Sequence, residues 1–346
     1  SSTVNAGANA TLSGSVSGTA ALAKTGASTL TLSGSNTYSG AVTVSAGGLT
    51  VSGGSSLGDT AALVLGAGTT LTLAGGNETI GSLSGSGNVV LGYRLTLGGD
   101  NTSTSFSGVI SSGGASGITK TGSGTFTLSG ANTYTGSTTV SAGTLAVSGS
   151  GTVGSNSAVT VASGATLSSS IAYLSLGSLS GAGTAAFGAN TLDVGGNNTS
   201  TTFSGNLSGS GQVYKAGTGT WTLSGDNSAS SAALDVLDSG ALSIASDSNL
   251  TTGTVTLNGG TLTLTGATTV DNAISLGINH GTVQADAAAT LEGTISGGGD
   301  LVKTGSATLT LSGTSSHTGD TNIQAGTLML TGSLAATNAV AVSAGA

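Results

Sequence analysis

The sequence predicts an all-β fold, a parallel β-solenoid (β-helix) of roughly 15–18 turns. Three observations predict this class. Short stretches alternate apolar and polar residues, as in "TFTL". The chain of 346 residues contains 63 glycines and no proline. A unit of roughly 90–96 residues also recurs about four times, which is typical of proteins built from stacked repeats.

All four lysines occupy the same place in a recurring segment. The segments read "KTGASTLTLSG" from Lys24, "KTGSGTFTLSG" from Lys120, "KAGTGTWTLSG" from Lys215 and "KTGSATLTLSG" from Lys303. They begin 96, 95 and 88 residues apart. We therefore expect residues 1–346 to form one continuous β-solenoid of about four super-repeats, the last cut short. We also expect the chain to be a fragment of a longer protein or the subunit of a polymer.

The strands are predicted from alternation with a period of two. Residues 125–128, Thr-Phe-Thr-Leu, place every second side chain on one face, as a strand with one buried face does. Apolar pairs such as Leu30/Leu32 and Leu49/Val51 recur about every 20 residues, the length of one solenoid turn. Phe126 and Trp221 replace leucine at an inward position, so we expect both to fill the core.

The corners between strands are predicted from glycine and asparagine. "SGSN", "SGAN" and "SGDN" follow three of the lysine segments, and Gly and Asn tolerate the positive φ that a sharp corner needs. Proline is unsuitable because every strand of a solenoid donates N–H groups to its neighbours. The lysines themselves are expected to be solvated corner residues that limit side-by-side aggregation.

Composition excludes several classes of function. A net charge of -8 with five basic residues offers no basic patch, so no nucleic-acid partner is expected. No apolar run approaches the roughly 18 residues of a membrane-spanning helix, so this segment is not expected to insert into a membrane. The absence of cysteine rules out disulfides and thiolate metal sites, and no cofactor is expected.

Few residues suggest catalysis, and we expect no enzyme and no catalytic residue. His280 and His317 are the acid/base candidates at neutral pH, and neither is accompanied in sequence by a recognisable triad. Carboxylates are densest in the third copy, where Asp226 and Asp247 are 21 residues apart and could stack on adjacent turns. Asp235 in the same copy is aligned with Val42.

Surface contacts with a glycan have four candidate residues. Asp226 and Asp247 are interpreted as surface acids that give solubility, with a weak cation site or glycan contact as the alternative. Tyr38 and Tyr134 lie in predicted corners, where a structural role is favoured and stacking on a ligand or glycan is the alternative.

One 30-residue stretch resembles a known family. Residues 118–147, "ITKTGSGTFTLSGANTYTGSTTVSAGTLAV", resemble the passenger-associated β-strand repeat of bacterial autotransporters, and residues 22–51 match nearly as well. The third copy lacks the tyrosine, and the fourth has His317 in its place. The resemblance implies a right-handed β-helix, as the rule for parallel crossovers also favours. It further implies an extracellular or outer-surface location in a Gram-negative bacterium.

The expected function is structural or adhesive. We expect the shaft of an autotransporter-like adhesin or a self-associating fibre, of the kind that builds filaments or biofilm. Low surface charge favours lateral self-association. The segments "SSTVNAGANATLSG" and "NAVAVSAGA" also predict axial, head-to-tail stacking. Host-cell or matrix glycans and proteins are the other expected partners. The alternative is a β-helix that binds or cleaves polysaccharide through surface carboxylates.

Overall fold

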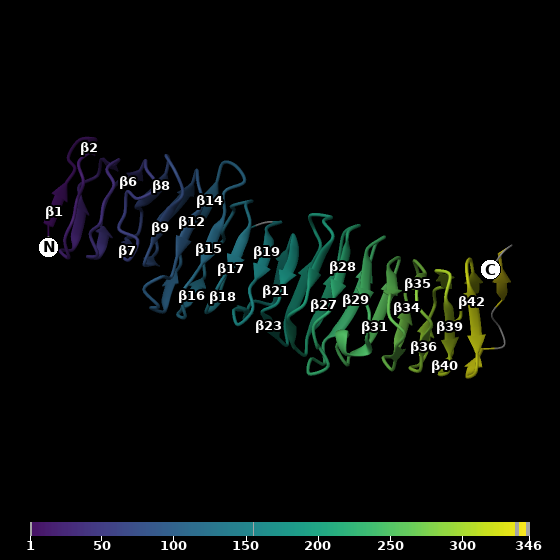
Figure 1. Cartoon of the computed structure of the whole chain (residues 1–346). Helices are drawn as coiled ribbons and strands as arrows, with labels where there is room; N and C mark the ends of the chain where they lie inside the picture. Colours follow the sequence, from purple (N-terminus) through teal and green to yellow (C-terminus); the bar gives the residue numbers. More distant parts are fainter. Residues whose placement is uncertain (1, 155, 336–338, 344–346) are drawn as a thin grey trace. The chain divides into compact units, whose positions relative to one another are not determined.

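The computed structural model describes residues 2–154, 156–335 and 339–343. Contacts divide the chain into two compact units, Ser1–Ile171 and Ala172–Ala346. Within each unit the named strands pair in parallel and stack turn upon turn, and the chain has about 17 such turns, which confirms the predicted β-solenoid fold class. Figure 1 shows the strands of each unit following one another turn by turn. Within the described ranges the helical content is one 3₁₀ turn, η1 (Asp247–Asn249), and no helix could cross a membrane.

The strands of the first unit form three sheets. One sheet has the order β1 (Ser2–Asn5), β3 (Leu22–Thr25), β5 (Val42–Val44), β7 (Ala62–Leu65), β10 (Ser82–Gly85), β13 (Thr104–Phe106), β16 (Thr125–Leu128), β18 (Thr144–Val147) and β20 (Thr166–Ser169). The next has β2 (Ala10–Leu12), β4 (Thr29–Leu32), β6 (Gly48–Val51), β8 (Thr70–Leu73), β11 (Asn88–Leu91) and β14 (Ile110–Ser112). The last has β9 (Glu78–Ile80), β12 (Leu95–Leu97), β15 (Ile118–Lys120), β17 (Thr138–Val140) and β19 (Ala158–Val161).

The second unit repeats this arrangement. One sheet has β21 (Tyr173–Leu176), β24 (Thr191–Val194), β27 (Gln212–Lys215), β29 (Ala233–Leu237), β31 (Val255–Asn258), β34 (Ile274–Leu276), β37 (Ile295–Gly297), β40 (Thr314–Ser315) and β43 (Ser333–Leu334). Another has β22 (Ser178–Gly181), β25 (Thr201–Phe203), β28 (Thr220–Leu223), β30 (Ala241–Ile244), β32 (Thr261–Leu264), β35 (Gly281–Ala285), β38 (Leu301–Thr304), β41 (Thr321–Ile323) and β44 (Val340–Val342). The remaining strands are β23 (Thr184–Gly188) with β26 (Asn206–Gly209), and β33 (Thr269–Val270), β36 (Ala289–Leu291), β39 (Thr308–Leu311) and β42 (Thr327–Leu330).

The core consists of apolar rows that run from turn to turn. In the first unit the register pairs, in succession, Leu30, Leu49, Leu71, Val89 and Ile110, and each of these side chains is fully buried. Complete burial of one such side chain contributes about 1.5–3 kcal/mol. Because the parallel register keeps like positions opposite each other, a period-two pattern in each strand is enough to build a continuous core.

Phe126 and Trp221 fill the core, as predicted. Each side chain is 1% exposed. Trp221 also donates a hydrogen bond from Nε1 to the Leu179 carbonyl oxygen (3.2 Å), and its ring lies 6.5 Å from that of Phe203, centroid to centroid. The largest aromatic side chain therefore satisfies its polar atom inside the solenoid, as a buried indole requires.

The lysines are buried, so the expectation of solvated corner residues is wrong. The exposed fraction is at most 3% for Lys24, Lys120, Lys215 and Lys303. The Lys120 ammonium donates hydrogen bonds to the carbonyl oxygens of Thr121, Gly122 (2.9 Å) and Ala142 (3.2 Å). Lys24 and Lys303 make the same three bonds and Lys215 makes the first two. Lysine points inward because it lies two residues after the inward apolar residue of its strand.

A glycine two residues after each lysine completes this corner. The φ angles are 81°, 65°, 66° and 76° at Gly26, Gly122, Gly217 and Gly305. This left-handed conformation turns the chain sharply, and glycine adopts it without steric cost. The carbonyl oxygens of the two residues after lysine then accept its hydrogen bonds, which compensates the cost of burying an ammonium. The Lys-x-Gly pattern is therefore one structural device.

Asparagines join consecutive turns at the next corner. Asn132 accepts a hydrogen bond from the Ile110 amide (2.8 Å) on the preceding turn and donates one to the Thr152 carbonyl oxygen (2.7 Å) on the following turn. Asn36 and Asn227 bridge their neighbouring turns in the same way. The "SGSN", "SGAN" and "SGDN" segments are thus corners, as predicted, and their asparagines satisfy buried backbone groups there.

Candidate functional site

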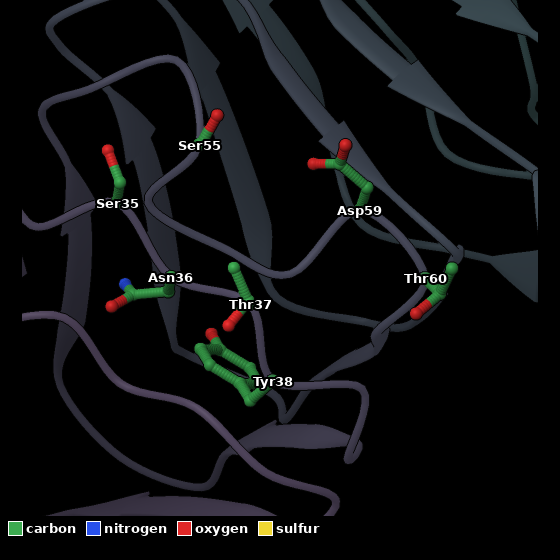
Figure 2. A pocket seen from close by; sticks show the side chains of 7 residues that line it. All are labelled: Ser35, Asn36, Thr37, Tyr38, Ser55, Asp59 and Thr60. Atoms are coloured by element: carbon green, nitrogen blue, oxygen red, sulfur yellow. The ribbon is translucent and has the colours of Figure 1, made fainter.

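A pocket of about 340 Å³ opens where two successive loops of the first unit meet (Figure 2). The loops follow β4 and β6. The lining residues are Ser35, Asn36, Thr37, Tyr38, Ser55, Asp59 and Thr60. Asn36 holds the loops together, because it accepts a hydrogen bond from the Val16 amide and donates one to the Ser56 carbonyl oxygen. The pocket offers hydroxyl and amide groups and one carboxylate, that of Asp59.

Tyr38 and Tyr134 are buried, which corrects their candidacy as surface contacts for a glycan. Their exposed fractions are 2% and 0%. Both lie two residues after a bridging asparagine, on the same inward side. The Tyr134 hydroxyl bonds the Thr138 hydroxyl (2.8 Å), which in turn lies 3.1 Å from that of Ser157. The tyrosine is therefore a core residue of the corner.

The Tyr38 hydroxyl lacks this network. Val42 and Ala61 occupy the positions of Thr138 and Ser157, so the two hydroxyl partners are missing. Tyr38 Oη is buried, and its polar neighbours are the Gly58 backbone and the Glu78 carboxylate rather than hydroxyl groups. Burial raises the pKa of Tyr38, and the nearby Glu78 carboxylate raises it further.

Glu78 is a buried acid that the sequence reasoning missed. It is 0% exposed and accepts hydrogen bonds from the amides of Leu57 (2.8 Å) and Ser56 (3.2 Å). Burial raises its pKa to about 7, against the lowering effect of these two amides. The same position before "GSLSG" is Leu174 in the second copy. Alternation with the inward Ile80 was the signal that placed Glu78 inside.

The pocket and the buried acid are separate features. Asp59 lines the pocket, whereas Glu78 does not and instead caps backbone amides of the loop behind it. Asp59 raises the pKa of Glu78 by repulsion, a smaller effect than burial. The arrangement can bind polar groups at the mouth of the pocket and hold or release a proton at Glu78.

Asp226 and Asp247 lie on neighbouring turns of the second unit. The amide of Asn227, next after Asp226, donates to the carbonyl oxygen of Ser248, next after Asp247, at 2.7 Å. Asp226 is exposed, and hydrogen bonds from the hydroxyl and amide of Ser228 lower its pKa. Asp247 begins η1 and is half-buried, which raises its pKa. The Asp247 carboxylate accepts a hydrogen bond from the Asp271 amide (3.3 Å), so the two carboxylates have different partners.

The alignment of Asp235 with Val42 is wrong by one residue. In β29 the register pairs Leu234 with Val213 and Asp235 with Tyr214, whereas in β5 it pairs Val42 with Leu22. Leu234 is therefore the inward equivalent of Val42. An extra residue in the preceding loop shifts the third copy.

The histidines lie in different environments. His280 is exposed, with Nδ1 3.2 Å from an Asp300 carboxylate oxygen and accepting a hydrogen bond from the Asp300 amide. His317 is fully buried at the position of Tyr134, and its Nε2 lies 3.2 Å from the hydroxyl of Thr321, the counterpart of Thr138. Burial lowers the pKa of His317. His317 thus takes over the structural role of the tyrosine.

Comparison with known proteins identifies the repeat. The family model described as passenger-associated-transport-repeat matches residues 22–51, 118–147, 213–233 and 301–330. A protein named "Adhesin BmaC autotransporter" from Brucella suis biovar 1 (strain 1330) is 38% identical over 351 residues. The match covers 93% of this chain and 10% of that protein, so the chain spans about a tenth of its length. No solved structure matches the chain.

The matched segments coincide with the corners described above. Each contains one of the four buried lysines, namely Lys24, Lys120, Lys215 and Lys303. The chain therefore contains four copies of the passenger-associated-transport-repeat.

Proposed function

We propose that the chain is a non-enzymatic section of the passenger of an autotransporter adhesin, displayed outside a Gram-negative cell. The observation that carries the proposal is the similarity over 93% of the chain to an autotransporter adhesin. The four repeat matches support it, because each copy contributes the same inward lysine and core rows to a uniform scaffold.

We further propose that residues 1–346 form one continuous solenoid that carries contact surfaces away from the cell. Each of the about 17 turns adds about 4.8 Å in the direction in which the strands stack. Repetition suits this task, because each turn is stabilised by its two neighbours and the length can grow without a new core.

Self-association is part of the proposal, either lateral or end to end. The scarcity of charge, 5% of residues, leaves little repulsion between the flanks of two molecules.

Surface labelling and cell binding test the adhesin proposal. Antibodies against the chain are expected to label intact cells of the bacterium that encodes it, and deletion of residues 1–346 from the parent protein is expected to reduce attachment to host cells or matrix. The purified chain should bind the same cells in flow cytometry. Labelling that requires permeabilised bacteria, or unchanged attachment after the deletion together with no binding of the purified chain, would contradict the proposal.

A further inference from the structure

The only arginine of the chain lines a second pocket of the first unit. The pocket has a volume of about 270 Å³ and is lined by Asn77, Tyr93, Arg94, Ala115, Ser116 and Gly117. Tyr93 and Arg94 form the short connection between β11 and β12, and residues 113–117 form the loop before β15 on the next turn. The pocket therefore combines a cation and an aromatic side chain.

The backbone of Arg94 is fixed by the preceding turn. Its amide donates a hydrogen bond to Asn77 Oδ1 (3.1 Å), and its carbonyl oxygen accepts one from the Glu78 amide (3.0 Å). From this anchor the side chain extends over the two following turns. Nη1 donates to the Thr119 hydroxyl (3.2 Å) and Nη2 to the Ser137 hydroxyl (3.4 Å). The guanidinium is thus positioned before any ligand binds.

The charge of Arg94 has no carboxylate partner. Both side-chain partners are neutral hydroxyls, and among residues 2–154, 156–335 and 339–343 the one ion pair within 4.0 Å joins His280 and Asp300. A guanidinium has five N–H donors, and two hydrogen bonds leave others for a ligand. In a chain with a net charge of -8, an unpaired and partly buried guanidinium is a selective place for an anion.

Tyr93 supplies an apolar surface beside this cation. It is 42% exposed, unlike the buried Tyr38 and Tyr134. The second copy has Asn190 and Thr191 directly before Leu192, where the first has Tyr93 and Arg94 before Leu95. Because the solenoid forms with either pair, neither Tyr93 nor Arg94 is required by the fold.

The opposite wall of the pocket is fixed to the same turn. The Ser116 hydroxyl donates to the Gly92 carbonyl oxygen (2.9 Å), and the Leu95 amide donates to that of Gly117 (3.2 Å). A Cβ atom at Gly117 would collide with the Ser137 carbonyl oxygen, so this position needs glycine. The loop of residues 113–117 is therefore held against residues 92–95, and the pocket lies between this loop and Tyr93.

We propose that Arg94 and Tyr93 form a binding site for a carboxylate-bearing sugar residue of an acidic glycan. The guanidinium binds the carboxylate with two parallel hydrogen bonds. The Tyr93 ring packs against the C–H face of the sugar. Asn77 and Ser116 also line the pocket and can form hydrogen bonds with the hydroxyl groups of the sugar ring. The volume of 270 Å³ is below the ~300–1,000 Å³ of drug-sized ligand sites, which suits a single sugar unit.

This inference rests on the proposed function, because only a surface-displayed chain meets such glycans. The carboxylate sugar can be a terminal sialic acid or a uronic acid within a polymer, and both present the same carboxylate on a pyranose ring. Titration of the full chain with N-acetylneuraminic acid and with glucuronic acid, followed by ligand-observed NMR, measures binding. The methyl ester of each sugar is the probe that lacks the charge.

Arg94→Thr, which introduces the residue of the second copy, is expected to weaken binding at least about tenfold, the effect of losing roughly 1.4 kcal/mol of charge-assisted hydrogen bonding. Arg94→Lys keeps the charge but loses the planar set of N–H donors that can bind both carboxylate oxygens, so it should also weaken binding. Tyr93→Asn is expected to weaken it less. Tyr173→Asn, which changes an exposed tyrosine of the second unit, is the matched control and should leave binding unchanged.

The outcomes separate the two levels of the proposal. Binding of one acid alone identifies the source of the carboxylate. Equal binding of the methyl esters, an unchanged affinity in Arg94→Thr, or binding of neither acid would overturn the site. If neither acid binds while the wild-type chain and Arg94→Thr still label host cells equally, the site is refuted and the adhesin function stands.

Discussion

The buried lysines show at the scale of single residues why a rare side chain recurs at one place. Lys120→Met removes three hydrogen bonds and leaves the half-buried carbonyl oxygens of Thr121, Gly122 and Ala142 without this donor. We expect it to lower the free energy of unfolding by roughly 2–4 kcal/mol, since unsatisfied buried groups cost about 1–3 kcal/mol each and relaxation recovers part of this. Urea denaturation followed by circular dichroism measures the change.

Thr127→Ala is the control for Lys120→Met. Thr127 lies on the outward side of β16, and its replacement should change stability by no more than about 0.5 kcal/mol. An unfolding midpoint for Lys120→Met within the range of this control would show that the ammonium does not stabilise the corner.

Glu78 makes the stability of the solenoid dependent on pH. Its pKa is raised from 4.5 to about 7 in the folded chain. A raised carboxyl pKa stabilises the folded state fully below pH 4.5, and this contribution is lost as pH rises towards and past 7. One pKa unit corresponds to about 1.4 kcal/mol, so the free energy of unfolding falls by roughly 3 kcal/mol over this pH range. Urea midpoints measured from pH 4.5 to 8 should therefore fall.

Glu78→Gln tests this origin. The amide side chain cannot ionise, so the variant should lose most of the decline between pH 4.5 and 8 that the wild type shows. A decline of equal size in both proteins would assign the pH dependence to other groups, and Glu78 would then be ionised throughout this range.

Alternation placed several polar side chains inside, although their chemistry suggested the surface. Lys24 follows Leu22 by two residues, Tyr38 follows Asn36 by two, and Glu78 precedes Ile80 by two, so each shares the inward face. The burial of these side chains could therefore be predicted from the sequence. Their partners could not be predicted, because the carbonyl and amide groups that satisfy them come from corners and neighbouring turns whose geometry depends on the register.

At the scale of elements, the corner glycines limit which sequences can form a turn. Gly122 has a φ of 65°, and an added Cβ atom would collide with the Gly98 carbonyl oxygen. Gly122→Ala is expected to lower the free energy of unfolding by about 2 kcal/mol or more, from left-handed strain and this collision together. Thermal or urea unfolding measures it.

Gly113→Ala is the matched control, because a Cβ atom at Gly113 meets no atom within 4 Å. This loop position should be neutral or slightly stabilised by the loss of unfolded-state freedom. If both alanine variants unfold at the same urea concentration as the wild type, the corner does not depend on glycine.

Strands were easier to predict than the loops that connect them. Period-two patterns located strands such as residues 125–128, because burial of one face is a local property. The displacement of Asp235 by one position arose in the loop before β29, where an extra residue leaves the corner longer and the strand unchanged. Loop length is free to vary in a solenoid, so alignment between copies fails there first.

At the scale of the whole molecule, the repeats and the fold class followed from the sequence, whereas the candidate binding sites did not. The pocket of Arg94 depends on loops from two successive turns that are far apart in the chain, namely residues 93–94 and 113–117. Neither stretch carries a motif. Their proximity follows from the parallel register, which pairs Leu95 with Ile118.

The charge of the whole chain predicts when molecules associate. At pH 7 the net charge of -8 supplies what repulsion there is between copies, and the net charge approaches zero near the pI of about 4.2. We therefore expect sedimentation velocity at micromolar concentration to show larger species at pH 4.2 than at pH 7.5. Protonated Glu78 stabilises the fold at the lower pH, so this association should occur with an unchanged circular dichroism spectrum.

Salt provides the independent check on this electrostatic account. At pH 7.5, raising the ionic strength from 0.01 M to about 1 M shortens the Debye length from about 30 Å to about 3 Å and should likewise increase association. If the species at pH 4.2 have lost β structure, aggregation of unfolded chains explains them instead. Monomers at pH 4.2, at pH 7.5 with low salt and at pH 7.5 with high salt would contradict lateral self-association. Display of binding surfaces would then remain as the role of the solenoid.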